Sequence, residues 1–147
     1  MKAFEGYKIK NVELRNKIVM PPMCMYSSDP NGHVQDFHRM HYGARSIGGA
    51  GLVIQEATAV ETRGRISDGD LGIWSDKHID GLSKLVQIIK GYGAVSGIQL
   101  AHAGRKCTIA DEDIVAPSPV KYDENYATPR EMTVGDIKNV VSAFKLA

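Results

Sequence analysis

Residues 51–60 read GLVIQEATAV, a mostly apolar and β-branched run. Such a run is typical of a strand that is buried on both faces in a parallel sheet. Residues 78–90 follow with apolar side chains at three-to-four-residue spacing and are succeeded by Gly91 and Gly93, which predicts an amphipathic helix. Residues 95–101, VSGIQLA, then predict another strand, the last of the three that we expect in the sheet. The order strand, helix, strand requires a crossover connection and therefore a parallel sheet of the α/β class.

The residues before this unit predict a cap, a strand and a helix. Residues 3–16 alternate loosely between apolar and polar positions, which suits a short β-hairpin that caps the fold. Residues 17–23, KIVMPPM, form a short apolar run that Pro21 and Pro22 should end, and we expect the first strand here. Residues 38–47 fit a modest helix that ends at Gly48 and Gly49.

The residues after it predict one more helix. A proline-containing loop leads to Thr133, three residues before Asp136 in the pattern of a capping box. This helix shows no stop signal before Ala147, so we expect residues 1–147 to be an incomplete part of one domain. About three βα units are present, whereas an eight-stranded barrel needs roughly 250 residues. A doubly wound sheet closes with fewer strands, but long segments after the strand ends favour the N-terminal portion of a (β/α)8 TIM barrel.

Composition excludes several classes of function. The 18 basic residues are balanced by 17 acidic ones, so no net charge draws the chain to nucleic acid or to an anionic membrane. No apolar run approaches the length of about 20 residues that spans a bilayer, and the first ten residues lack the pattern of a secretory signal. We therefore expect a cytoplasmic protein. Cys24 and Cys107 lack the spacing of a metal or disulfide motif and are expected to be free thiols.

Two reactive groups follow the first predicted strand. Cys24 and Tyr26 are two residues apart and share one side of the chain if it stays extended, so both should point into the mouth of the sheet. The simpler interpretation makes Cys24 a small buried hydrophobic residue and Tyr26 an aromatic at the rim. A thiol-based redox sensor is a further hypothesis, and it requires that the pKa of Cys24 be lowered.

The ends of the other two strands carry further candidates. Small residues around Ala57 would let a flat ligand approach the backbone, although dense packing explains them equally well. Gln99 places a primary amide in an apolar strand, where it needs either a protein partner or a ligand such as a pyrimidine-like ring edge. Lys106 is expected to be solvated and Arg105 to be structural. His38 and His41 are spaced for a shared metal, but no further ligand is evident, so we expect no metal site.

In order and spacing, several segments resemble the N-terminal half of the Old Yellow Enzyme family: PPMCMYS, EATAV, GRISDGDLGIW, GIQLAHAGRK, APS and ATPREMT. Cys24, at a position where other branches carry threonine, makes the chain similar to the subgroup of thermophilic-like NADPH dehydrogenases or ene-reductases. The resemblance implies FMN as cofactor, NADPH or NADH as reductant, and an activated alkene such as an enone as substrate. It also implies ping-pong hydride transfer.

The resemblance further implies roles for individual residues. Pro21, Pro22, Met23 and Cys24 would lie along the flavin, with the thiol tuning its potential. Ala57 would contact the flavin through its backbone, and Gln99 would bind the pyrimidine edge. Tyr26 would orient the oxygen of the substrate, and Tyr26 and Cys24 are thus the residues expected to take part in catalysis.

The family's paired histidines, its proton-donating tyrosine and its phosphate-binding loops do not lie within residues 1–147. We therefore expect that this chain alone is not catalytically competent, whereas the parent enzyme is. The alternative is a half-barrel without catalytic activity that binds a ligand or self-associates through its open strand edges, and a homo-oligomer is expected in either case.

Overall fold

A four-stranded parallel sheet forms the centre of the computed structural model, which describes residues 1–147. The strands are β3 (Val19–Met20), β4 (Leu52–Ala59), β5 (Leu71–Gly72) and β6 (Val95–Ala101). β4 is the central strand, because β3 and β5 pair with one of its edges and β6 pairs along the other. All of these pairs are parallel, as the order of elements predicts. The other edge of β6 is open.

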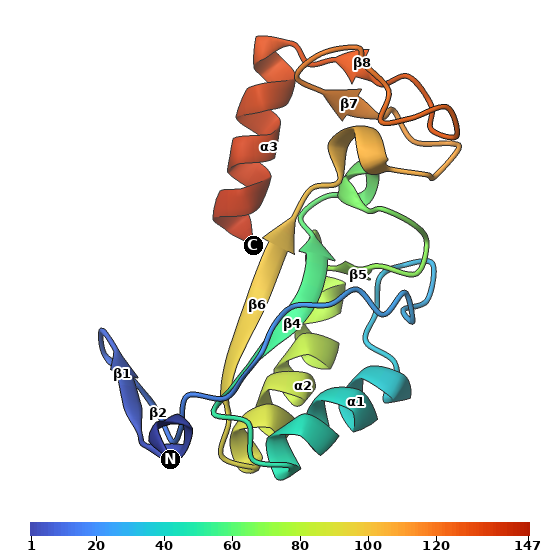
Figure 1. The fold of residues 1–147 in the computed structure, drawn as a ribbon. Coiled ribbons are helices and arrows are strands. Elements are labelled where there is room, and N and C mark those ends of the chain that lie inside the picture. Colours follow the sequence, from blue (N-terminus) through green and yellow to red (C-terminus); the bar gives the residue numbers. More distant parts are fainter.

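Two helices cover one side of this sheet (Figure 1). They are α1 (Asp36–Ile47) and α2 (Ile79–Gly91), and they pack against each other and against the strands. The apolar stripe predicted for the second helix is confirmed, since Leu82, Leu85 and Ile89 are buried in the main core. That core also contains Met20, Val34, Tyr42, Ala50, Val53, Leu71 and Ala94.

The ends of α1 follow from local chemistry. The first turn is closed by His38, whose Nδ1 accepts from the Gln35 backbone N–H at 3.0 Å and whose own N–H donates to the Gln35 carbonyl at 3.1 Å, so the helix begins two residues before the predicted start. It ends at Ile47 with Gly48 as the C-cap residue, and Gly49 follows with φ of 102°, a value that L-residues rarely adopt. The predicted glycine stop is therefore confirmed.

The first strand is shorter than predicted. Pairing with β4 stops at Met20, and residues 21–27 are not part of the sheet. Pro21 and Pro22 have no N–H to donate to a neighbouring strand, so the pattern of hydrogen bonds ends where they begin. The chain that leaves the sheet is thereby directed over the end of β4.

The predicted hairpin forms from β1 (Tyr7–Ile9) and β2 (Val12–Leu14) and lies at the end of the sheet where β4 and β6 begin (Figure 1). Arg15, just after the hairpin, holds it there. Its guanidinium donates to the carbonyl oxygens of Ser46, Ala50 and Tyr92 at 2.6 to 3.1 Å. The charge is thus satisfied by the loops that enter β4 and β6.

The opposite end carries β7 (Val115–Ala116), β8 (Arg130–Glu131) and α3 (Val134–Leu146) (Figure 1). The capping box predicted at Thr133 and Asp136 is present. The Arg130 guanidinium donates to both Asp113 and Asp136. Its hydrogen bonds to Asp136 are the main cause that lowers the pKa of that carboxyl below its usual value. Short 3-10 turns at Lys2–Phe4, Thr62–Gly64, Asp76–His78 and Gly104–Lys106 complete the chain. None of the helices has the length and hydrophobicity that crossing a membrane requires.

Replacing Leu85 with alanine should strongly destabilise the protein, because Leu85 is fully buried where α2 packs on the sheet. We expect Leu85→Ala to lower the free energy of unfolding by about 2 to 5 kcal/mol, measured by urea denaturation. Ile47→Ala is the control, since Ile47 is 64% exposed at the end of α1, and it should change stability by less than about 1 kcal/mol. Equal losses in the two variants would contradict this account of the core.

Candidate functional site

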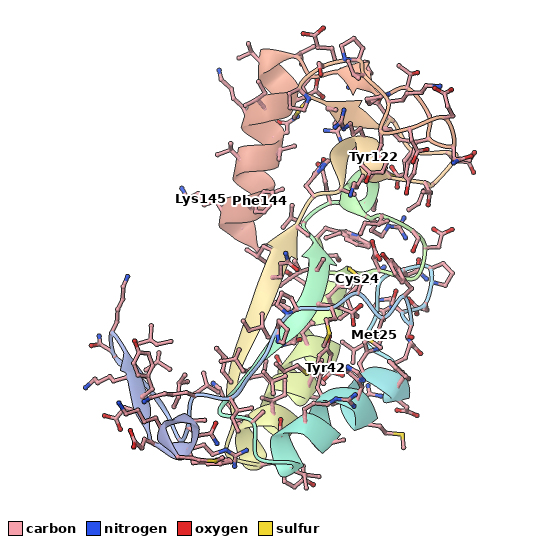
Figure 2. All side chains as sticks on the ribbon, in the orientation of Figure 1. Cys24, Met25, Tyr42, Tyr122, Phe144 and Lys145 are labelled. Atoms are coloured by element: carbon pink, nitrogen blue, oxygen red, sulfur yellow. The ribbon has the colours of Figure 1, made fainter.

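The segment after β3 lies across the carboxyl end of β4. Pro21 and Met23 are exposed, whereas Pro22 and Cys24 are half-buried. Cys24 and Met25 lie beside the upper part of β4, with Tyr42 of α1 below them (Figure 2). The stretch predicted to line a cofactor is therefore at the end of the sheet where the parallel strands terminate.

Tyr26 does not continue an extended chain. Its φ is 50°, in the left-handed region. The assumption of an extended chain, which placed Cys24 and Tyr26 on one side, was therefore wrong. A Cβ on Gly69 would come within 2.7 Å of the Tyr26 carbonyl oxygen, and only glycine allows the two segments to approach so closely. The Tyr26 side chain is 52% exposed, and partial burial, followed by the Cys24 thiol, raises the pKa of its hydroxyl.

The surroundings of Cys24 favour the neutral thiol. Burial raises its pKa, and the charges of Asp70 and Glu56 raise it further. The hydroxyl of Tyr26 and the backbone of Ala57 oppose this rise in the pKa of Cys24. A redox sensor needs a lowered thiol pKa, because the thiolate is the reactive form. The raised pKa of Cys24 therefore disfavours the redox-sensor hypothesis.

Ala57 and Gln99 are direct partners across β4 and β6. A β-bulge interrupts the register between Gln55 and Ala57, so that Gln55 faces Ile98 and the next paired residues are Ala57 and Gln99. The Met25 N–H donates to Glu56, the neighbour of Ala57, so Cys24 also lies at this end of β4 and the three predicted residues come together at one rim. Gln99 is exposed rather than buried as predicted, because β6 is an edge strand.

A buried carboxylate that the sequence analysis missed lies under this rim. Glu56 is fully buried, and its Oε2 accepts from the Met25 backbone N–H at 2.8 Å. Its Oε1 accepts from the Tyr42 hydroxyl at 3.0 Å, and the Tyr42 oxygen accepts from the Glu56 backbone N–H at 2.9 Å. Burial raises the pKa of Glu56, while the bonds from Met25 and Tyr42 oppose the rise. A glutamate within an apolar strand is the signal that could have revealed it.

The two histidines of α1 have separate environments. His38 is fully buried, its Nδ1 accepts from the Gln35 backbone N–H, and its Nε2 lies 3.5 Å from Glu56 Oε1. His41 instead stacks on Phe37, with ring centroids 5.4 Å apart. The structure contains no group of three or more potential metal ligands.

The loop after β6 is held by charge contacts. His102 Nδ1 accepts from the Gly104 backbone N–H, so its Nε2 carries the proton that is donated to Glu61 at 2.7 Å. Glu61 also binds Arg63. Lys106 is exposed, with its Nζ 4.2 Å from the centre of the Tyr122 ring, and Arg105 lies farther from the same ring.

A cavity of about 200 Å³ opens at this end of the sheet. Small side chains dominate its lining, which consists of Ala57, Ala59, Gly64, Ile66, Asp70, Ala101, His102, Ala103 and Lys106. The Asp70 Oδ1 is buried without a hydrogen-bond partner, whereas its Oδ2 accepts from the backbone of Ile66 and Ser67. Burial raises the pKa of Asp70. A larger cavity of about 940 Å³ lies between α2, β6 and the end of α3 and is lined by none of the predicted site residues.

Comparison with known proteins identifies the family of the chain. A model of the NADH:flavin oxidoreductase / NADH oxidase family matches residues 2–147. An NADPH dehydrogenase of Clostridium acetobutylicum is 56% identical over 147 residues, which are 100% of this chain and 43% of that protein. An NADPH dehydrogenase of Bacillus subtilis is 52% identical over 147 residues, or 99% and 43% of the two chains. The chain thus spans less than half the length of these relatives.

Solved structures of the same fold are also similar. A complex of 2-naphthoyl-CoA reductase superposes with a TM-score of 0.90 at 25% identity, over 97% of this chain and 24% of that one. Morphinone reductase superposes with a TM-score of 0.88 at 24% identity, over 97% and 42% of the two chains. An Old Yellow Enzyme from Pichia gives a TM-score of 0.88 at 22% identity, over 97% and 40%. The chain therefore forms part of a TIM barrel.

The family model covers nearly every residue, and the predicted partial barrel, with its strand ends at one rim, is present. FMN is the cofactor of the matching family and NADPH the reductant named for the curated relatives. The chain belongs to the NADH:flavin oxidoreductase / NADH oxidase family.

Proposed function

We propose that this chain provides one wall of the FMN site in an NAD(P)H-dependent enzyme that reduces the C=C bond of enone-type substrates. The observation that carries the proposal is the position of Cys24, Ala57 and Gln99, from three segments, at one rim of the sheet. When bound, FMN would accept hydride from NAD(P)H and deliver it to the activated alkene.

The residues present fit such a group. Gln99 exposes a carboxamide with both donor and acceptor atoms, which suits the N–H and C=O pattern of a pyrimidine edge. Its partner Ala57 is small and lines the 200 Å³ cavity, so a planar ring can approach the β4 backbone. Pro21, Pro22 and Met23 would lie along the same ring.

Cys24 and Tyr26 would act at the mouth of the site. A neutral thiol beside the ring changes its reduction potential without adding a charge, and the raised pKa of Cys24 keeps the thiol neutral. The exposed Tyr26 hydroxyl would donate to the carbonyl oxygen of the substrate and orient it.

The chain alone would lack turnover. Phosphate sites of TIM barrels are commonly built after strands seven and eight, and the sheet described here has four strands, two of them only two residues long. We propose that residues 1–147 bind FMN weakly and that catalysis requires the remainder of the barrel.

A half-barrel that self-associates is the second candidate, favoured by the open edge of β6 and by Ile98, which is 36% exposed on it. Size-exclusion chromatography with light scattering and an equilibrium titration with FMN separate the two. The FMN site predicts that the chain quenches FMN fluorescence at equilibrium, which also detects weak binding. A dimer that leaves FMN fluorescence unchanged would support the second candidate instead.

Replacing Gln99 should weaken FMN binding. Gln99→Ala removes a pair of hydrogen bonds, so we expect the Kd for FMN to rise by about tenfold, measured by quenching of FMN fluorescence. Gln87→Ala is the matched control, because Gln87 is also exposed but lies on α2. If both variants bind FMN as the unaltered protein does, Gln99 is not a contact.

The thiol of Cys24 should be unreactive at neutral pH. Because its pKa is raised, the thiolate forms only as pH rises beyond the usual value of about 8.5, and alkylation by iodoacetamide should have its midpoint above that value. Mass spectrometry of the Cys24 peptide across a pH series measures the rate. A midpoint near pH 7 would restore the redox-sensor hypothesis.

A further inference from the structure

We infer that Glu56 is a positioning residue that holds the Cys24–Tyr26 segment at the mouth of the site, through the Met25 backbone N–H and the Tyr42 hydroxyl. The inference rests on the proposed FMN site for its function. It goes beyond that proposal because Glu56 does not line the cavity and contacts the Cys24–Tyr26 segment through the Met25 backbone N–H.

The bulge in β4 makes this arrangement available. Ala57, directly after Glu56, lines the cavity, whereas the Glu56 carboxylate reaches α1 and the segment after β3. One strand residue therefore faces the cavity and its neighbour supports the segment that covers it. Both belong to the same rigid part of the sheet.

The supported segment has a conformation that needs support. Tyr26, with φ of 50°, is in a region that residues with a Cβ adopt at a cost in free energy. Contacts on both sides hold it. Before it, the Met25 N–H donates to Glu56 at 2.8 Å, and after it, the Ser28 N–H donates to the Gly69 carbonyl at 3.0 Å. The Ser28 hydroxyl also donates to the Asp70 carbonyl at 2.6 Å.

The Glu56 carboxylate accepts hydrogen bonds from both the Met25 N–H and the Tyr42 hydroxyl, and it therefore joins the two groups. A buried carboxylate is costly unless it is hydrogen-bonded, and Glu56 is fully buried. Leucine at this position would leave the Met25 N–H without a partner, whereas glutamine would keep an acceptor oxygen for it. The two substitutions therefore separate the role of the acceptor from that of the charge.

The experiment compares the alkylation of both thiols in the full protein and in Glu56→Leu, Glu56→Gln and Tyr42→Phe. Iodoacetamide labelling is followed by peptide mass spectrometry, and Cys107, which is 1% exposed, serves as an internal reference for unfolding. Glu5→Leu, at an exposed position of the N-terminal cap, is the matched control. Titration with FMN, followed by fluorescence, runs in parallel on the same samples.

For Glu56→Leu we expect Cys24 to be labelled at least about fivefold faster than in Glu56→Gln, because the segment opens when its donor loses a partner. Cys107 should keep its rate, Tyr42→Phe should give an intermediate rate for Cys24, and Glu5→Leu should change neither thiol. The Kd for FMN should rise about tenfold in Glu56→Leu and less than about threefold in Glu56→Gln.

Equal Cys24 rates in the leucine and glutamine variants would overturn the inference, and so would a joint rise of Cys24 and Cys107, which indicates general unfolding. If the leucine variant does not fold, an unchanged Cys24 rate in Tyr42→Phe overturns it. If the unaltered protein binds no FMN, the proposed function fails, but the labelling rates still decide whether Glu56 positions the segment.

Discussion

The structure of the candidate site depends on the β-bulge in β4. In a regular strand, side chains two residues apart share a face, so Ala57 would point to the same side as Gln55. Gln55 lines the larger cavity, of about 940 Å³, beside α2, whereas Ala57 lines the cavity of about 200 Å³ at the rim. One extra residue, Glu56, reverses the alternation and lets the strand place a small side chain at the site.

The same irregularity explains a buried charge. Glu56 is turned toward α1, where Tyr42 donates to it, and toward the chain leaving β3, where Met25 donates to it. A carboxylate in this position is stable only because several donors compensate for lost water. The hydrogen bonds that satisfy Glu56 therefore also join β4, α1 and the Cys24–Tyr26 segment into one unit.

The rim is constructed from segments that are far apart in sequence and have different degrees of support. Cys24 and Tyr26 lie on irregular chain that is fixed by Glu56 on one side and by Gly69 on the other. Gln99 lies on a strand that is regular but has one open edge, which leaves its amide exposed. The loop beyond it is fixed by the pair of His102 and Glu61. The backbone is thus held in place in the Cys24–Tyr26 segment, in β6 and in the loop after β6. The Gln99 amide and the Tyr26 hydroxyl stay accessible to a ligand.

The sequence by itself determined the elements and their order. Apolar periodicity located β4, α2 and β6, glycines marked the end of α1, and the Thr133 capping box marked the start of α3, because these signals are local. The candidate residues were also found from the sequence, since polar groups at strand ends and the family motifs are visible there. Only the tertiary structure decided the bulge, the left-handed Tyr26, the exposure of Gln99 and the role of Glu56 as an acceptor. Each of these features depends on a contact with a residue that is distant in the chain. A local sequence pattern does not predict which distant residues come into contact.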